Sequence, residues 1–119
     1  MKDNQKDYYP TYWSGCNPIH AVRDWCKVRR IIRDARRGAH IPPIIIEGDL
    51  GNGNLLTGTH RAAANDICMM LGQEPIVDYI GIEQLPATTI KRYRKAIDRG
   101  DNDLANDILA SAEKRYKIN

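Results

Sequence analysis

The most constraining feature of this sequence is the junction between a short apolar segment, Leu55-Leu56-Thr57, and an alanine-rich stretch that starts at Thr59. The apolar segment is typical of a strand, and the alanine-rich stretch is typical of a helix. Gly58 stands between them, where the missing Cβ permits a sharp backbone turn. The junction therefore predicts a strand, a tight turn and a helix in immediate succession.

The residues of this junction have the chemistry of an anion site. The first N–H groups of a helix have no partner within the helix, and the helix dipole favours negative charge beside them. Thr59 adds a hydroxyl, His60 a donor that titrates near neutral pH, and Arg61 a planar set of donors that matches phosphate. We expect Gly58, Thr59, His60 and Arg61 to hold phosphate. The alternative is an ordinary turn in which Thr59 caps the helix and Arg61 points to solvent.

A long helix is predicted over residues 17–38. Asn17 and Pro18 are favourable opening residues, apolar residues recur at helical spacing, and Gly38 stops the pattern. The opposite side of this helix is basic, and its cationic residues are Arg23, Lys27, Arg29, Arg30, Arg33, Arg36 and Arg37. Such a run is either a solvated helix face or a surface for phosphate, nucleic acid or an acidic protein.

The rest of the chain alternates strand and helix signals. The expected elements are a buried strand at 44–46, its hairpin return at 54–57, a helix that ends near Gly72, a strand at 74–80, and two helices hinged at Gly100-Asp101. We predict an α+β (mixed α/β) domain with a small mixed sheet and a C-terminal helical hairpin. The expected parts are an aromatic N-terminal arm over 1–16, the main domain over 17–86, and the hairpin over 87–119.

The arm groups Tyr8, Tyr9, Tyr12 and Trp13 around Pro10. Aromatic side chains of this kind cover the edge of a core, stack on a base, or contact a second subunit. A homodimer is therefore one expected assembly.

At this point the chain resembles the ParB/sulfiredoxin-like nucleotide-binding superfamily. The resemblance covers about Val28 to Ile80: a basic helix, the segment IPPIII, a glycine-containing hairpin, the box LLTGTHRAAA and a further strand. In that superfamily a Gly-x-[His or Arg]-Arg box opens a helix and holds nucleotide phosphates. The resemblance implies that Gly58, Thr59, His60 and Arg61 bind a nucleoside triphosphate, ATP or CTP, with Mg²⁺ as an accompanying ion.

The activity implied by the resemblance is a small-molecule kinase or an NTPase. Sulfiredoxins carry a reactive cysteine immediately before the His-Arg pair, and Thr59 stands there in this chain, so sulfinic acid reduction is not expected. Phosphoryl transfer needs a carboxylate near the acceptor, and Glu47 and Asp49 are the candidate catalytic acids. Their alternative role is that of turn residues before a glycine-rich segment.

Two other functions stay open. A DNA- or RNA-binding protein would use the basic helix and the Lys91–Lys95 cluster, and a partner-binding adaptor would carry a decayed nucleotide site. The chain has 119 residues, a net charge of +3 and three cysteines without a close pair, which does not indicate a secreted disulfide framework. The polar start is not typical of a signal peptide, and no apolar run is long enough for a membrane span, so we expect a cytoplasmic protein.

Overall fold

The computed structural model describes residues 7–116, and the sheet at its centre organises the rest of the chain. β1 (Ile44–Glu47) lies in the middle of three strands, antiparallel to β2 (Asn54–Leu55) and parallel to β3 (Tyr79–Gly81). The helices are α1 (Trp25–Arg36), α2 (Thr59–Met70), α3 (Ala87–Asp98) and α4 (Asn102–Arg115), with a 3-10 turn, η1 (Ile82–Gln84), after β3. The prediction of an α+β fold with a small mixed sheet is confirmed.

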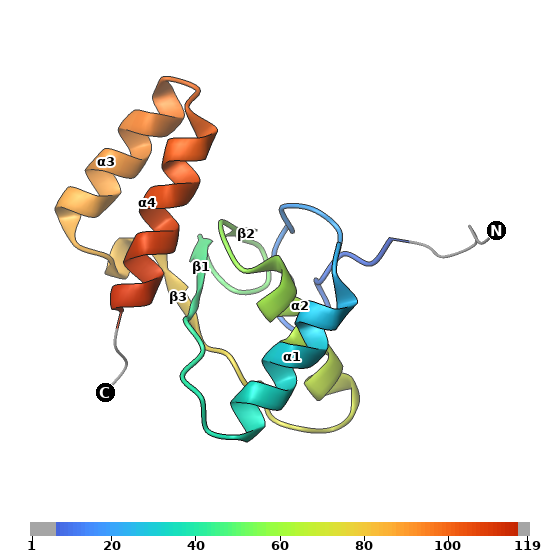
Figure 1. Cartoon of the computed structure of the whole chain (residues 1–119). Helices are drawn as coiled ribbons and strands as arrows, with labels where there is room; N and C mark the ends of the chain where they lie inside the picture. The colour runs from blue at the N-terminus through green and yellow to red at the C-terminus, as the bar shows by residue number, and fades with distance from the viewer. Residues whose placement is uncertain (1–6, 117–119) are drawn as a thin grey trace.

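The two faces of the sheet have separate partners (Figure 1). Side chains alternate along a strand, so Ile44 and Ile46 face α2 while Ile45 faces α4. The core on the α2 side contains Cys16, Ile44, Ile46, Leu55, Ala62 and Val77. The core on the α4 side contains Ile45, Ile80, Ile82, Leu85, Leu109 and Ala112. Burial of each isoleucine side chain contributes about 1.5–3 kcal/mol, which explains why three consecutive isoleucines form the central strand.

The first helix begins later than the sequence pattern predicts. Residues 17–24 are not helical, and α1 starts after Asp24, whose side chain accepts a hydrogen bond from the amide of Lys27 at 3.1 Å. Asn17 instead pairs beside β2: its amide bonds to Gly53 O, and its carbonyl accepts from Leu55 N, both at 2.8 Å. The predicted start at Asn17 and Pro18 was wrong because these backbone groups are used beside the sheet.

The strand predicted over 74–80 is confined to β3. The buried side chain of Asn65 on α2 accepts hydrogen bonds from the amides of Ile76 and Val77 at 2.8 and 2.9 Å, and it donates to Val77 O at 2.8 Å. The backbone before Asp78 therefore bonds to a helix side chain and does not join the sheet. The length of this strand was overestimated because a sequence pattern does not indicate such a competitor.

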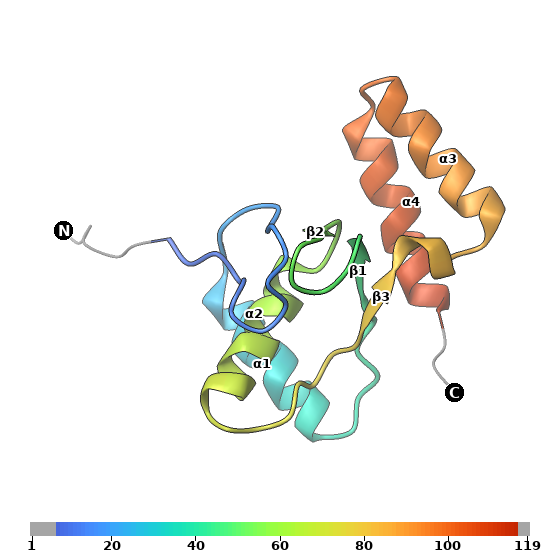
Figure 2. The ribbon, with the colours of Figure 1, turned by 180° about the vertical axis from the view of Figure 1, so that it is seen from behind.

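The described part of the N-terminal arm lies across α2 (Figure 2). Asp66 of α2 is fully buried and accepts three hydrogen bonds: from Tyr8 Oη at 2.7 Å, from Trp13 N at 2.9 Å and from Tyr12 N at 3.2 Å. These bonds attach the arm to α2, while the side chains of Tyr9, Tyr12 and Trp13 are exposed. Residues 1–6 of the predicted arm and 117–119 of the predicted hairpin segment lie outside the described residues.

The helical hairpin after Pro86 is confirmed, with its turn at Gly100 and Asp101. The hairpin stands out from the sheet, and the C-terminal part of α4 lies nearest to β1 and β3 (Figure 1). Leu109 and Ala112 make the core contacts of α4. Within residues 7–116, no helix is both long enough and apolar enough to cross a membrane.

Candidate functional site

The predicted strand-turn-helix junction is present, and its turn requires glycine. Gly58 caps α2 with φ of 84° and ψ of 35°, a left-handed conformation that other residues adopt at a cost. A Cβ at this position would lie 2.9 Å from Ile44 Cγ1 and 3.3 Å from Arg61 Cζ. The turn is therefore packed between the central strand on one side and the guanidinium group on the other.

The first turn of α2 forms part of the wall of an open cleft of about 770 Å³. α1 and the segment before it supply one side, and α4 supplies the opposite side. The residues that line this cleft, which we call the box cleft, are Ile19, His20, Arg23, Lys27, Ile31, Ile41, Pro42, Leu56, Thr57, Gly58, Thr59, His60, Arg61, Asn106, Ala110 and Glu113. All four predicted phosphate-binding residues lie in this one wall.

Arg61 is bonded to the protein itself. Its Nη1 donates to Pro42 O and Pro43 O, both at 2.9 Å, and its Nη2 donates to Glu113 Oε1 at 3.0 Å and Oε2 at 2.9 Å. The two side chains are 15% and 11% exposed. The alternative of an ordinary turn required Arg61 to point to solvent, and it does not. Its terminal nitrogens already donate to protein acceptors before any ligand binds.

His60 has a structural role that the sequence did not indicate. Its Nε2 accepts from Arg23 N at 3.2 Å and from Asp24 N at 3.1 Å, so the imidazole bonds to the backbone at the start of α1. Burial lowers the pKa of His60 below 6.5, and the positive charge of Lys27 and the nearby His20 lower it further. The neutral form is required here because a protonated Nε2 cannot accept a hydrogen bond.

Several hydrogen-bond donors of the Gly58–Arg61 box have no acceptor in the described part of the chain. The first hydrogen bond of α2 runs from Ala62 N to Gly58 O. The amides of Thr59, His60 and Arg61 come before it and have no acceptor within the helix, and Gly58 has no side chain to cap them. Thr59 is 4% exposed, and its Oγ1 has no hydrogen-bond partner among residues 7–116. A buried hydroxyl without a hydrogen-bond partner destabilises the folded protein, so Thr59 is a candidate donor to a ligand.

The rim of the box cleft adds positive charge. Arg23 and Lys27 are exposed on the side formed by α1 and the segment before it, and both line the cleft. Arg23 lies just before the helix and Lys27 lies in its first turn, and because both line the cleft, their charges act on the same region of it. The electrostatic environment at the start of α2 therefore combines the helix dipole with two exposed cations.

Glu47 and Asp49 are not among the residues that line the box cleft. Glu47 ends β1 and forms an exposed ion pair with Arg94 of α3 at 3.3 Å, while Asp49 is exposed in the turn after β1. The carbonyl of Asp49 accepts from Gly53 N at 2.7 Å. The structure does not bring these two carboxylates together with the Gly58–Arg61 box.

Sequence reasoning missed Glu113 and Asn106 as residues of the box cleft. Leu109 and Ala112 mark the inner face of α4, and Glu113 follows on the edge of that face. An acidic residue at the edge of an apolar face is a weak signal, because most such residues remain in solvent. Only the fold places it opposite Arg61.

No protein-family model, curated protein or solved structure matches this chain. The ParB/sulfiredoxin-like resemblance therefore stays a prediction from the sequence. The site has to be interpreted from its own geometry.

Proposed function

We propose that this protein binds a phosphate-bearing small ligand of the nucleoside di- or triphosphate class in the box cleft. The observation that carries the proposal is the first turn of α2, where the amides of Thr59, His60 and Arg61 and the hydroxyl of Thr59 have no partner among the described residues. Amides at a helix start attract anions because the N–H groups and the helix dipole act together.

Arg23 and Lys27 would supply the cationic contacts that the sequence assigned to Arg61. Both are exposed and line the cleft, and neither side chain donates to an acceptor among residues 7–116. In the free protein Arg61 would support the turn, since its guanidinium lies beside Gly58 and donates to the carbonyls of Pro42 and Pro43. The phosphate cradle is then made of backbone amides, one hydroxyl and two flexible cations.

The remainder of the box cleft favours an organic ligand over inorganic phosphate. Ile19, Ile31, Ile41 and Leu56 line it with apolar surface that could contact a base or sugar, and Asn106 adds an amide on the side of α4. A volume of about 770 Å³ lies within the range of small-molecule sites, about 300–1,000 Å³. The resemblance to the ParB/sulfiredoxin-like superfamily implies the same class of ligand.

The proposal is one of binding, without a phosphoryl-transfer step. Among the cleft-lining residues that the structure describes, Glu113 is the only one with a carboxylate, and both of its oxygens accept from Arg61. The cleft therefore offers no free carboxylate to Mg²⁺, which prefers oxygen ligands. The residues present do not fit a protein-held magnesium site, and we assign no catalytic residue.

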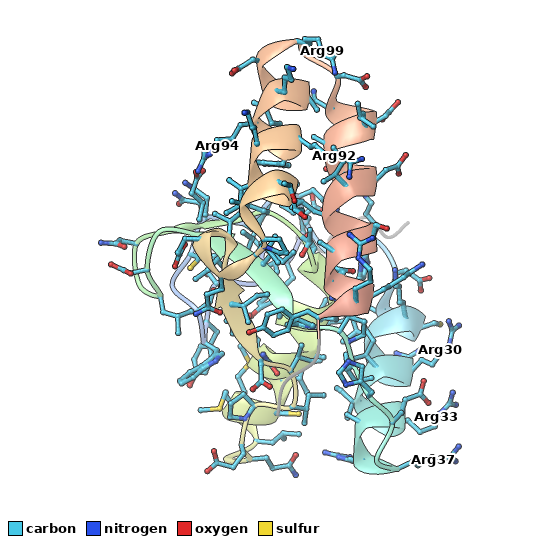
Figure 3. All side chains as sticks on the ribbon, turned by 90° about the vertical axis from the view of Figure 1, so that its left-hand side faces the viewer. Arg30, Arg33, Arg37, Arg92, Arg94 and Arg99 are labelled. Atoms are coloured by element: carbon cyan, nitrogen blue, oxygen red, sulfur yellow. The ribbon has the colours of Figure 1, made fainter. Side chains whose placement is uncertain are left out.

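A second candidate function is nucleic-acid binding through α1. Arg30, Arg33 and Arg37 project along one side of this helix, away from the sheet (Figure 3). All three are exposed, and the nearest recorded partner is Asp34, which lies 3.6 Å from Arg33. Guanidinium groups spaced along a helix suit a phosphate backbone, and affinity would then fall steeply as salt rises.

Titration calorimetry of ATP, CTP and inorganic pyrophosphate, compared with a short duplex DNA and a single-stranded RNA, tests the two candidates. Lys27→Gln should weaken nucleotide binding by about tenfold, since one cation near a phosphate contributes about 1.4 kcal/mol. Arg37→Gln is the matched control: it removes the same charge at the C-cap of the same helix, outside the box cleft.

The two variants separate the candidates. Loss of nucleotide affinity in Lys27→Gln but not in Arg37→Gln supports the box cleft. Binding of nucleic acid alone, with a steep salt dependence and weakening by Arg37→Gln, would support the α1 surface and overturn the first proposal.

A further inference from the structure

We propose that Glu113 is an internal competitor for the ligand, so that filling the box cleft loosens the attachment of α4. This inference rests on the proposed function, because it concerns the same cleft. It follows from three features: how Arg61 is bonded, where Glu113 lies, and how α4 is held.

Arg61 donates four hydrogen bonds to protein acceptors, two of them to Glu113. Its guanidinium packs against Gly58, where a Cβ would lie 3.3 Å from both Cζ and Nε. The group is thus at the turn where a phosphate would approach the amides of α2. A phosphate and the Glu113 carboxylate are both anionic acceptors for guanidinium donors.

Glu113 is 8% exposed and also lines the box cleft. A carboxylate in a cleft repels an incoming phosphate unless a cation neutralises it, and Arg61 now does so. A phosphate that draws Arg61 towards itself would leave Glu113 buried without its partner. Because an unpaired buried charge is strongly unfavourable, Glu113 would then move out towards water.

Movement of Glu113 would affect α4, because its neighbours attach this helix to the sheet. Leu109 and Ala112 precede Glu113 on the inner side of α4 and pack with Ile45 and Ile80. The C-terminal part of α4 is the part of the hairpin nearest to the sheet (Figure 1). Occupancy of the cleft and attachment of α4 are therefore linked, and the linkage acts equally in both directions.

Glu113→Gln tests this competition. The amide keeps the shape of the side chain and one acceptor for Arg61, but it removes the negative charge. We expect Glu113→Gln to bind ATP or pyrophosphate about 5- to 50-fold more tightly than the wild type, a coupling of ordinary size between sites. Asp107→Asn is the control, since it removes an exposed carboxylate from the same helix outside the cleft.

Amide hydrogen exchange of the wild-type chain provides a second measurement. Saturating ATP should accelerate exchange over residues 109–115 while it slows exchange in the first turn of α2. Tighter binding by Glu113→Gln together with this exchange pattern supports the proposal. ATP binding by Glu113→Gln, with no binding by the wild type, supports it as well. If the wild type binds ATP but Glu113→Gln binds no more tightly than Asp107→Asn, or if exchange in α4 slows, the competition is refuted while nucleotide binding stands. If neither the wild type nor Glu113→Gln binds ATP, CTP or pyrophosphate, the proposed nucleotide binding and the proposed competition are both refuted.

Discussion

Arg61 and Glu113, 52 residues apart in sequence, form an ion pair in which one guanidinium nitrogen lies 3.0 and 2.9 Å from the two carboxylate oxygens. The pair joins the first turn of α2 to α4 across the box cleft. It explains how a residue expected to bind phosphate is also a structural residue of the free protein. Two consequences are open to measurement: the stability that the pair confers and the ligand affinity that it restrains.

Arg61→Ala should destabilise the protein by about 2–4 kcal/mol, because it leaves Glu113 charged and nearly buried and removes the donors to Pro42 and Pro43. Urea unfolding followed by circular dichroism measures this loss. Arg94→Ala is the comparison, since the Arg94–Glu47 pair is 56% and 44% exposed and should contribute less than about 1 kcal/mol. Equal effects of the two substitutions would show that the Arg61 pair is not structural.

Thr59→Val should leave the stability of the free protein unchanged or raise it by up to about 1 kcal/mol, because the lost hydroxyl has no partner among the described residues. The same substitution should weaken ATP binding by about tenfold if the hydroxyl donates to a phosphate oxygen, a loss of about 1.4 kcal/mol. Thermal unfolding with and without ATP measures both effects in one experiment. Unchanged affinity would remove Thr59 from the cradle.

His60 should make folding sensitive to pH. Burial lowers the pKa of His60 in the folded chain, so the unfolded chain takes up its proton first as the pH falls. The stability from neutral His60 is fully present above the unfolded value of 6.5 and is lost as the pH falls from there through the lowered folded pKa. Chemical unfolding between pH 7.5 and 5 should show this loss in the wild type.

His60→Gln should reduce that pH dependence, because its amide oxygen can accept from Arg23 N or Asp24 N but does not titrate. Substitution of the exposed His40 by glutamine controls for general effects of losing a histidine. A wild-type slope that matches the slope of His60→Gln over this range would contradict the proposed role of the imidazole at the start of α1.

Asp66→Ala should cost more than Tyr8→Phe. The alanine substitution removes the acceptor for Tyr8 Oη, Tyr12 N and Trp13 N, for an expected loss of about 2–4 kcal/mol, whereas Tyr8→Phe removes one bond and about 1 kcal/mol. In a Trp25→Phe background, the fluorescence of Trp13, whose amide bonds to Asp66, should report the release of the arm in Asp66→Ala. An unchanged emission spectrum would mean that other contacts hold the arm.

Local patterns predicted most of this fold. The three isoleucines of β1, the glycine turn at Gly58 and the stop at Gly72 each act within a few residues, so periodicity and turn chemistry indicate them. The late start of α1 and the short β3 could not be predicted in this way. Asn17 and Asn65 each engage backbone groups distant in sequence, and local patterns carry no record of those partners.

The candidate site was predicted in part. The box residues do lie together at the start of α2, since their arrangement depends on consecutive residues. The bonding of Arg61 and His60 depends on Glu113 and on the start of α1, which the fold brings in from elsewhere. Glu47 and Asp49 were proposed from nearness in sequence, but neither lines the box cleft, although Pro42, before β1, does.

The most direct test of the central proposal is a titration of ¹⁵N-labelled protein with inorganic pyrophosphate and with ATP, followed by the amide resonances. We predict saturable shifts of the Thr59, His60 and Arg61 amides, with small shifts at the start of α3, which is also a helix N-terminus. If those three amides stay in place while resonances along Arg30 to Arg37 move, or if no resonance saturates, the first turn of α2 is not an anion site.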